Sequence, residues 1–402
     1  MARVMFVTSW LSYGGAERHA VALANRLGER GHECHFVYVK RDAALLERLR
    51  LPDGGSVHCL EAERYLDLRA FRDFAAHMAR SAPCAIVAAN GYALMYAWLA
   101  LRIARLRLPL VATFHSTRLL GAKEWLQMLA YRPLFWTSSC SVFVSERQRR
   151  HWLRRGLLSR RNETIHNGVD TDAFRDRWGP AERAALRAGL GLRQSDYVIG
   201  MSALLRPEKN HLQLVDAVAA LRARGIAARA LMIGDGEMRA AIEARARGLG
   251  ISGDVVITGL RQDVRPCVAT CDVLALCSLT EAFSLAALEA MALARPVVHS
   301  DVGGAAEMIE PGRNGFLFPV GDTRSLVERL ALLADRALGA RMGRNAREVV
   351  ERRFSERTMV DRYERLILEL GGPAPPGTPS IRTTPAAQKR HTEIRSWPDG
   401  AL

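Results

Sequence analysis

The sequence predicts an α/β protein of two domains, each built around a parallel β-sheet. Two segments, one at the N-terminus and one at residues 271–320, show the order strand, loop, helix, strand that is typical of parallel sheets. A chain of 402 residues is also long enough to form two separate hydrophobic cores. Ligands of such sheets bind beyond the carboxyl ends of the strands, so we expect the functional residues in the loops at those ends.

The N-terminal segment begins with an apolar run at residues 4–10, which is typical of a buried strand. A helix is expected to extend to Gly28, and residues 34–39 form the next strand. The adjacent glycines Gly14 and Gly15 lie in the intervening loop. The dinucleotide-binding pattern G-x-G-x-x-G is absent, so the pair on its own indicates a tight turn.

Three more apolar runs in the first half predict strands, at residues 85–89, 108–114 and 141–145, and a basic helix is expected at 146–157. His115 comes directly after the second of these strands. A histidine in that position is placed to touch a substrate, but it is equally typical of a side chain that bonds to backbone at a strand end. The residues alone leave both interpretations of His115 open.

The second half of the chain follows a polar, helix-prone linker at residues 178–193. A strand at 197–201 is followed by Arg206 and Lys209, which would form a phosphate clamp from a forked donor and a point charge. Two solvated surface charges are the alternative. Further strands are expected at 229–233 and 255–258, and helices at 322–333, 339–354 and 356–370.

Residues 271–320 are the most informative about chemistry. After an apolar strand comes a loop with Glu281, and Ser284 is placed as the N-cap of a helix at 285–293 that contains Glu289. The free amides of such a helix end suit a diphosphate, and a carboxylate accepts hydrogen bonds from two vicinal hydroxyls. Glu289 could therefore hold a ribose and Glu281 a hexose. Otherwise Glu281 supports the helix dipole and Glu289 is an exposed helix residue.

This segment resembles the E-x7-E region of retaining glycosyltransferases of the GT-B fold, family 4, and the similarity extends over nearly the whole chain. Where the family usually has Glu-Gly-Phe-Gly, this chain has Glu281-Ala282-Phe283-Ser284, whose small residues still permit a close backbone approach. The arginine that family members often place five residues before the lysine is Leu204 here, and Arg206 is expected to replace it. The matching residues are Glu281, Glu289, Ala290-Met291-Ala292, Pro296-Val297-Val298, Asp301-Val302-Gly303-Gly304, Glu307 and Asn314-Gly315.

The resemblance implies two Rossmann-like domains whose parallel sheets face each other across a cleft. The N-terminal domain, residues 1–176, would bind the acceptor, and the C-terminal domain, residues 192–355, would bind a nucleotide-sugar donor. The helix at 356–370 would pack back on the first domain. The tail at 371–402 is rich in Pro, Gly, Thr and Ser without periodicity and is expected to be disordered.

The resemblance also assigns roles to individual residues. The catalytic set would be Glu281, His115, Arg206 and Lys209, with His115 contacting the transferred sugar and the two cations neutralising the departing diphosphate. Gly14, Gly15 and His115 would line the acceptor side of the cleft. The residues expected to bind the donor are Gly15, Arg206, Lys209, Phe283, Ser284, Leu285 and Glu289.

Neither a metal nor another cofactor is expected. Asp170 and Asp172 match the D-x-D pattern of metal-dependent glycosyltransferases, but they follow Asn167-Gly168 in a turn context where paired carboxylates are common. Enzymes of the GT-B fold normally neutralise phosphates with cationic side chains. The seven cysteines have neither a C-x-x-C pair nor metal-site spacing, so free thiols in a reducing cytosol are expected.

The net charge of +15 is concentrated in residues 101–162, where 13 Lys or Arg stand against two Asp or Glu. Basic residues between large apolar ones suit an anionic membrane surface, and a solvated basic face over an ordinary core is the alternative. The sequence has no nucleic-acid-binding motif, so nucleic acid is not an expected partner. The large apolar side chains of this block are Trp125, Leu126, Met128, Leu129, Phe135, Trp136 and Trp152.

Together with the resemblance, these features predict a glycosyltransferase that moves a sugar from a UDP- or GDP-sugar to a glycan or lipid-linked acceptor. Retention of anomeric configuration and a role in cell-surface polysaccharide or lipopolysaccharide biosynthesis are implied. No apolar run is long enough for a signal sequence or a membrane span, so we expect a cytoplasmic protein attached to the inner face of the cell membrane. A GT-B epimerase or phosphorylase and a noncatalytic nucleotide-sugar-binding protein are the alternatives.

Overall fold

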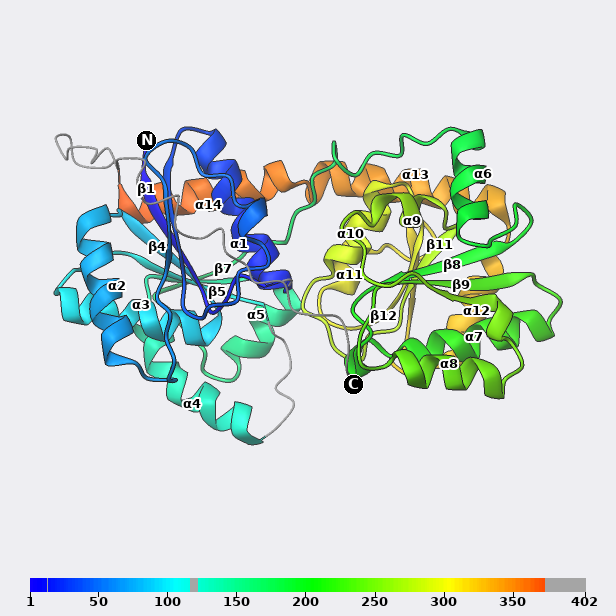
Figure 1. Ribbon diagram of the computed structural model, residues 1–402, viewed down its shortest axis with the longest axis horizontal. Helices are drawn as coiled ribbons and strands as arrows, with labels where there is room; N and C mark the ends of the chain where they lie inside the picture. Colours follow the sequence, from blue (N-terminus) through cyan, green and yellow to red (C-terminus); the bar gives the residue numbers. More distant parts are fainter. Residues whose placement is uncertain (13, 116–121, 373–402) are drawn as a thin grey trace, which may run out of the picture.

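A computed structural model describes residues 1–12, 14–115 and 122–372, except for the side chains of 122–125. Figure 1 shows two α/β lobes side by side, each with a central sheet between helices. Neighbouring strands are parallel throughout both sheets. The prediction of two Rossmann-like domains with parallel sheets is therefore confirmed.

The first sheet has seven strands. They are β1 Arg3–Thr8, β2 Glu33–Tyr38, β3 Ser56–Cys59, β4 Ala85–Ala89, β5 Leu110–Phe114, β6 Cys140–Phe143 and β7 Arg161–Thr164. Their spatial order is β3-β2-β1-β4-β5-β6-β7, so the chain runs from β1 to one edge and then from β4 to the other. This reversal leaves a crevice at the carboxyl ends of β1 and β4, where ligands of doubly wound sheets bind.

Helices cover both faces of the first sheet. They are α1 Gly15–Glu29, α2 Leu68–Ser81, α3 Asn90–Ala104, α4 Ala122–Thr137 and α5 Glu146–Leu153, with a 3-10 turn, η1, at Leu46–Arg48. One hydrophobic core joins the sheet to α2 and α3 through Phe74, Met78 and Tyr96. A second core on the other face includes Leu23 of α1. Burial of these apolar side chains is the main force that holds the helices to the sheet.

The second sheet has six strands, in the spatial order β10-β9-β8-β11-β12-β13. They are β8 Tyr197–Ser202, β9 Ala228–Ile233, β10 Val255–Ile257, β11 Val273–Leu276, β12 Val297–Ser300 and β13 Gly315–Phe318. The helices around them are α6 Pro180–Gly189, α7 His211–Ala223, α8 Arg239–Gly248, α9 Arg265–Ala269, α10 Leu285–Ala292, α11 Ala305–Met308, α12 Thr323–Leu332 and α13 Arg336–Arg353, with 3-10 turns η2 at Pro207–Lys209 and η3 at Ser252–Asp254. The reversal point of this sheet lies between β8 and β11, and both strands lead into loops that carry predicted site residues.

The last helix, α14 at Glu356–Gly371, returns to the first lobe. Figure 1 shows α13 and α14 following each other along one side of the molecule. Met359 and Tyr363 of α14 enter the same core as α1. Where the chain crosses between lobes for the first time, Val169 forms a parallel bridge with Ser355, so the two crossings support each other.

Some predicted boundaries shift in the structure. The strand expected to end at residue 145 ends at Phe143, because Ser145 is the N-cap of α5. Helix α5 ends at Leu153 rather than at 157, and Gly156 beyond it has a positive φ of 77° that breaks the helix. The tail predicted at 371–402 lies, beyond Gly372, outside the described residues. Within the described part of the chain, no helix has the length and apolar character needed to cross a bilayer.

Candidate active site

The loop from β11 into α10 forms one wall of the candidate site. The Ser284 hydroxyl accepts a hydrogen bond of 3.2 Å from the Ala287 amide, so the predicted N-cap is confirmed. The Phe283 side chain is buried, with its ring centroid 5.0 Å from that of His166 and 5.4 Å from that of Phe354. Because this ring packs at the crossing between the lobes, Phe283 can present mainly its backbone groups to a ligand at the helix start. Leu285, the first residue of the helix, is only partly buried.

Two glycines after β12 hold this loop in place. Gly303 has a positive φ of 51°, and a Cβ added there would lie 2.1 Å from the carbonyl oxygen of Glu281. A Cβ on Gly304 would lie 2.4 Å from the Phe283 ring and 2.7 Å from Cβ of Ser145 in the other lobe. Glycine is therefore required at both positions, since the backbone passes directly against the loop that carries Glu281.

Glu281 and Lys209, both predicted as catalytic, are brought together. Lys209 ends the turn η2 after β8, and its Nζ lies 2.5 Å from Oε2 of Glu281. Both side chains are partly buried, which strengthens this pair relative to one on the open surface. Arg206 does not join them: its side chain is 58% exposed, and its ion pair is with Glu208 at 4.0 Å. Leu204, at the position where the family often has arginine, is half-buried beside it.

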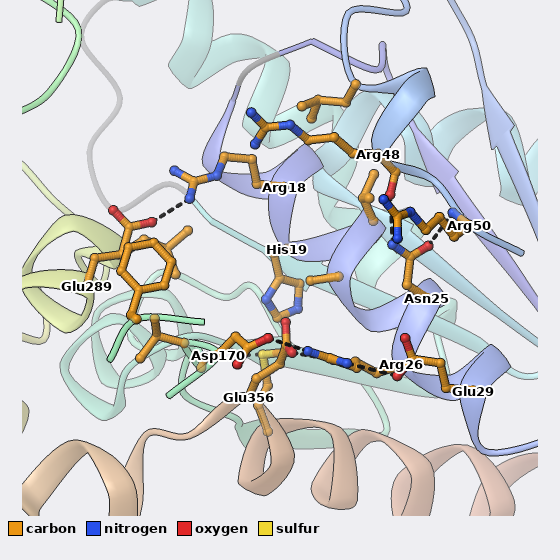
Figure 2. Close-up of a pocket in the computed structure, with 18 of the residues that line it drawn as sticks. Arg18, His19, Asn25, Arg26, Glu29, Arg48, Arg50, Asp170, Glu289 and Glu356 are labelled. Carbon is orange, nitrogen blue, oxygen red and sulfur yellow. Dashed lines mark hydrogen bonds and ion pairs between the residues drawn. The ribbon is translucent and has the colours of Figure 1, made fainter. Parts of the chain in front are cut away.

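Glu289 is buried in α10 and forms an ion pair with Arg18 from α1 of the other lobe. Figure 2 shows the two side chains reaching toward each other across the gap between the lobes. The Glu289 carboxylate raises the pKa of Arg18. The alternative in which Glu289 is an exposed helix residue is therefore wrong. The ion pair of Glu289 comes from the other lobe, so the sequence around Glu289 could not reveal it.

Gly14 and Gly15 lie at the start of α1, and the surroundings of the two glycines differ. Gly14 is the N-cap, and a Cβ added there would lie 2.0 Å from Oε2 of Glu17, which is itself buried. Burial raises the pKa of Glu17. A Cβ on Gly15 would meet nothing within 4 Å. Gly14 is extended and Gly15 is the first residue of α1, so the pair begins a helix rather than forming the tight turn that the sequence alone suggested.

His115 lies at the end of β5 and pairs with a histidine that the sequence analysis missed. Its ring centroid is 4.9 Å from that of His19 in α1, and its amide donates to Oδ1 of Asn90 at 3.2 Å. Burial, together with His19, holds the pKa of His115 well below its usual range, and burial lowers the pKa of His19 to about 4. Both imidazoles are therefore neutral at pH 7. Among the described residues, the buried Nε2 of His115 has no hydrogen-bond partner.

The pair Asp170 and Asp172 lies at the crossing between the lobes. Oδ1 of Asp170 accepts the amides of Asp172 at 3.0 Å and Ala173 at 2.9 Å, which is an Asx turn. Oδ2 of Asp170 lies 2.5 Å from Arg26, which also binds Glu356 at 2.5 Å. These contacts border a hollow of about 430 Å³ between α1, α10 and α14 (Figure 2). No cluster of metal-ligating side chains occurs within the described residues.

Comparison with known protein families identifies the chain. Residues 182–349 match the family described as Glycosyl transferases group 1, and residues 13–173 match Glycosyltransferase Family 4. The chain belongs to glycosyltransferase family 4. Because these two matches cover both lobes, the glycosyltransferase assignment extends over the body of the molecule, and the protein is a transferase enzyme.

Curated relatives and solved structures agree with membership in family 4. N-acetyl-alpha-D-glucosaminyl L-malate synthase of Bacillus anthracis is 28% identical over 378 residues, which cover 90% of this chain and 96% of that protein. UDP-Gal:alpha-D-GlcNAc-diphosphoundecaprenol alpha-1,3-galactosyltransferase of Escherichia coli is 26% identical over 51% of this chain and 54% of its own. The crystal structure of Anabaena Alr3699/HepE in complex with UDP superposes with a TM-score of 0.79 at 24% identity, covering 92% of this chain and 100% of that one. Such structural neighbours assign the GT-B fold.

Proposed function

We propose that this family 4 glycosyltransferase uses a nucleotide-sugar donor and retains the configuration at the anomeric carbon. The observation that carries the proposal is the Lys209–Glu281 pair beside the N-terminus of α10. A cation and free helix amides at one place suit a diphosphate, while the adjacent carboxylate suits sugar hydroxyls. Alr3699/HepE, whose fold this chain shares, was crystallised with UDP and with UDP-glucose. A UDP- or GDP-sugar is the proposed donor.

In the proposed reaction the bond between the anomeric carbon and the diphosphate oxygen breaks while the acceptor oxygen bonds on the same face of the sugar. The acceptor proton passes to the leaving phosphate. The charge that develops on the diphosphate is stabilised by Lys209, by the backbone amides after Ser284, and by Arg206 once its side chain turns inward. Glu281 orients the sugar and Glu289 the ribose. Neutral His115, whose buried Nε2 has no partner among the described residues, contacts the sugar from the first lobe.

The proposed acceptor is a glycan or a lipid-linked saccharide of the cell surface, at the cytoplasmic face of the membrane. The names of two relatives support a cell-surface acceptor: the Escherichia coli enzyme acts on a diphosphoundecaprenol-linked sugar, and LpsE of Rhizobium meliloti is a lipopolysaccharide core biosynthesis glycosyltransferase. A basic surface on the first lobe supports the same location. Nucleic acid is not proposed as a partner.

The donor proposal is tested by isothermal titration with UDP, GDP, ADP and TDP and with the corresponding sugars, followed by an assay for release of the nucleotide. One nucleoside diphosphate should bind clearly more tightly than the others, and its sugar should be hydrolysed slowly in the absence of acceptor. If no nucleotide binds, the donor proposal fails. Binding that leads to sugar epimerisation rather than transfer or hydrolysis would support the epimerase alternative instead.

We also propose that the reaction needs no divalent metal. Asp170 is engaged by Arg26 and by two backbone amides, so it has little capacity left for an ion. Lys209 and the α10 amides supply the positive charge that a metal would otherwise provide. Activity after metal removal and in excess chelator should equal the untreated rate. Full loss that Mg²⁺ or Mn²⁺ restores would contradict this prediction.

A further inference from the structure

A second hollow, of about 500 Å³, lies between α5 of the first lobe and α11 of the second. Arg150, Arg154 and Arg155 line it on the α5 side, and Gly303 and Glu307 line it on the other. None of the arginines takes part in the proposed donor site. The hollow is open toward solvent and spans the boundary between the lobes, which is where a second substrate has access.

The positive charge in this hollow is not balanced by the acids around it. The carboxylate of Glu307 already accepts the amides of Glu146 and Arg147, each at 2.9 Å, and lies 2.8 Å from Nε2 of His166. Burial opposes ionisation of Glu307, but these hydrogen bonds lower its pKa. Arg147 has its own partner, Asp301, at 2.7 Å. The local acids are therefore occupied by other donors.

The three remaining arginines have no strong carboxylate partner among the described residues. The contact of Arg150 to Glu146 is long, at 3.7 Å, and Glu146 is held more closely by Arg149 at 2.7 Å. Within the described residues, the Arg155 side chain reaches only the ring Nδ1 and the carbonyl of His151, both at 3.2 Å. No ion pair involves Arg154 within the described part of the chain. Several forked donors gathered without a counter-charge match a phosphoryl group, which accepts paired N–H bonds from guanidinium.

The hollow adjoins the proposed sugar position. Gly303 lines it, and the backbone of Gly303 is packed so closely on the carbonyl of Glu281 that a Cβ would lie 2.1 Å away. The other face of the same loop carries the Glu281 carboxylate that contacts Lys209. An anionic group bound by α5 would therefore hold the rest of its molecule beside the reacting end of the donor.

The opposite end of the hollow adjoins an exposed apolar stripe on α4. Arg132 of α4 donates to the carbonyl of Arg155 at 2.6 Å, and Trp136 donates to the carbonyl of Gly156 at 2.9 Å. Along the same helix Leu126, Leu129 and Trp136 are 70%, 44% and 53% exposed. A hydrocarbon chain attached to a phosphoryl group in the hollow would find an apolar surface next to it.

We infer that this hollow binds the phosphoryl group of a lipid-linked acceptor, with the lipid directed toward α4 and the acceptor saccharide toward Glu281. The inference rests on the proposed transferase function and specifies its acceptor class. Arg150, Arg154 and Arg155 supply the forked donors, and the hollow is separate from the donor diphosphate site.

The first test titrates inorganic pyrophosphate into enzyme saturated with UDP, so that the donor phosphate site is already filled. Wild-type protein should bind one further pyrophosphate, and the Arg150→Gln/Arg154→Gln variant should bind it at least tenfold more weakly. The control is Arg341→Gln/Arg344→Gln, which removes the same charge from exposed positions of α13 in the other lobe and should bind as wild type does. Absence of a second site, or equal loss in both variants, overturns the inference.

The second test distinguishes a lipid-borne phosphoryl group from a soluble one. Phosphatidylcholine vesicles with and without a polyprenyl phosphate are sedimented with UDP-saturated enzyme. The polyprenyl phosphate should increase binding for wild type and control but not for Arg150→Gln/Arg154→Gln. Equal recruitment of all three proteins, or no recruitment despite pyrophosphate binding, overturns the lipid assignment. Because UDP binding is measured first, failure of the donor proposal is recognised separately.

Discussion

Charged residues of the candidate site are held in place by ion-pair partners, because a buried charge needs a counter-charge. Glu289 is buried, and a buried carboxylate without a counter-charge would be strongly destabilising. Arg18 supplies that charge from a position 271 residues away in the chain. A ribose that is to bind Glu289 must share or replace this contact. Neither the burial of Glu289 nor its partner could be predicted from sequence, because both depend on how the two lobes meet.

The first residue-scale prediction concerns Glu281. Changing Glu281→Gln removes the negative charge that faces Lys209 and one acceptor for sugar hydroxyls, while the side chain keeps its shape. Loss of one oriented group at a transition state costs roughly 2–4 kcal/mol, so kcat should fall strongly with the fold retained. Glu328→Gln, on the exposed side of α12, is the matched control and should keep the wild-type rate. Unchanged kcat and KM in Glu281→Gln would remove this residue from the site.

The second residue-scale prediction is a pH dependence from His19. Burial lowers its pKa from 6.5 to about 4 in the folded protein, beside His115 and Tyr363. Between these values the unfolded chain binds the proton and the folded protein does not. The stability is therefore complete above pH 6.5 and falls by about 3 kcal/mol as the pH drops toward 4.

Denaturation curves of wild type and His19→Gln, recorded from pH 7 to pH 4, measure this contribution. The midpoint of wild type should fall more steeply with decreasing pH than that of His19→Gln. Other buried histidines, such as His77 and His211, remain in both proteins and contribute equally to both slopes. Identical slopes would show that His19 is not held neutral by the fold.

At the scale of elements, prediction succeeded where local signals were strong. The buried strand at Ala85–Ala89 was predicted with its observed bounds, and Ser284 caps α10 as its position indicated. Strand β3 was not predicted, because it lies at a sheet edge and its four residues are half-buried or exposed. Helix α2 was also missed, although Asp67 caps it and Phe71, Phe74 and Met78 repeat at helical spacing.

The N-terminus of α5 is completed by a residue from the other lobe, which gives an element-scale prediction. Glu307 accepts the first two amides of α5, a contact that a capping side chain usually makes within one segment. Glu307→Ala should lower the free energy of unfolding by about 1–2 kcal/mol, and looser contact between the lobes should raise the KM for the donor. Glu310→Ala, three residues further on and half-exposed, is the control. Equal midpoints in urea for both variants would contradict the capping role.

At the scale of the whole molecule, the two lobes are joined on both sides of the crossing by polar contacts. Arg18–Glu289 and Arg48–Gln262 lie on one side, and the Arg147–Asp301 pair lies on the other. The general fold was predictable because apolar runs typical of buried strands recur along the sequence. The meeting of α5 and α11 around one basic hollow, with α4 beside it, was not, because it depends on residues between 132 and 307 coming together in three dimensions.

The basic block at residues 101–162 combines core and surface residues. Met128, Phe135 and Trp152 are buried, so the interpretation of these three as ordinary core residues is the one that the structure supports. Leu126, Leu129 and Trp136 are exposed, and Trp125 lies outside the described side chains. The exposed three follow one another along α4, which leaves an apolar stripe beside arginines of α5.

This arrangement predicts reversible binding of the first lobe to anionic membranes. Each Lys or Arg near an anionic surface contributes on the order of 1 kcal/mol, and salt weakens that term. An exposed leucine that enters the interface adds roughly 1 kcal/mol that salt does not weaken. Binding to phosphatidylglycerol vesicles should therefore fall, but not vanish, as the salt concentration rises. Changing Arg149, Arg150, Arg154 and Arg155 to Glu should abolish the salt-dependent part.

Leu126→Gln/Leu129→Gln tests the apolar part of the same surface. Both side chains are already exposed, so the melting temperature should stay close to that of wild type. The residual vesicle binding at high salt should be lost, while the salt-dependent binding at low salt remains. The proposed UDP site lies in the other lobe, so UDP binding should survive in every variant. Equal sedimentation of wild type with neutral and anionic vesicles would show that the arginines play no part, and sedimentation with neither would leave this face as solvated surface. Separate loss of the two parts would show that charge brings the lobe to the membrane and that α4 holds it there.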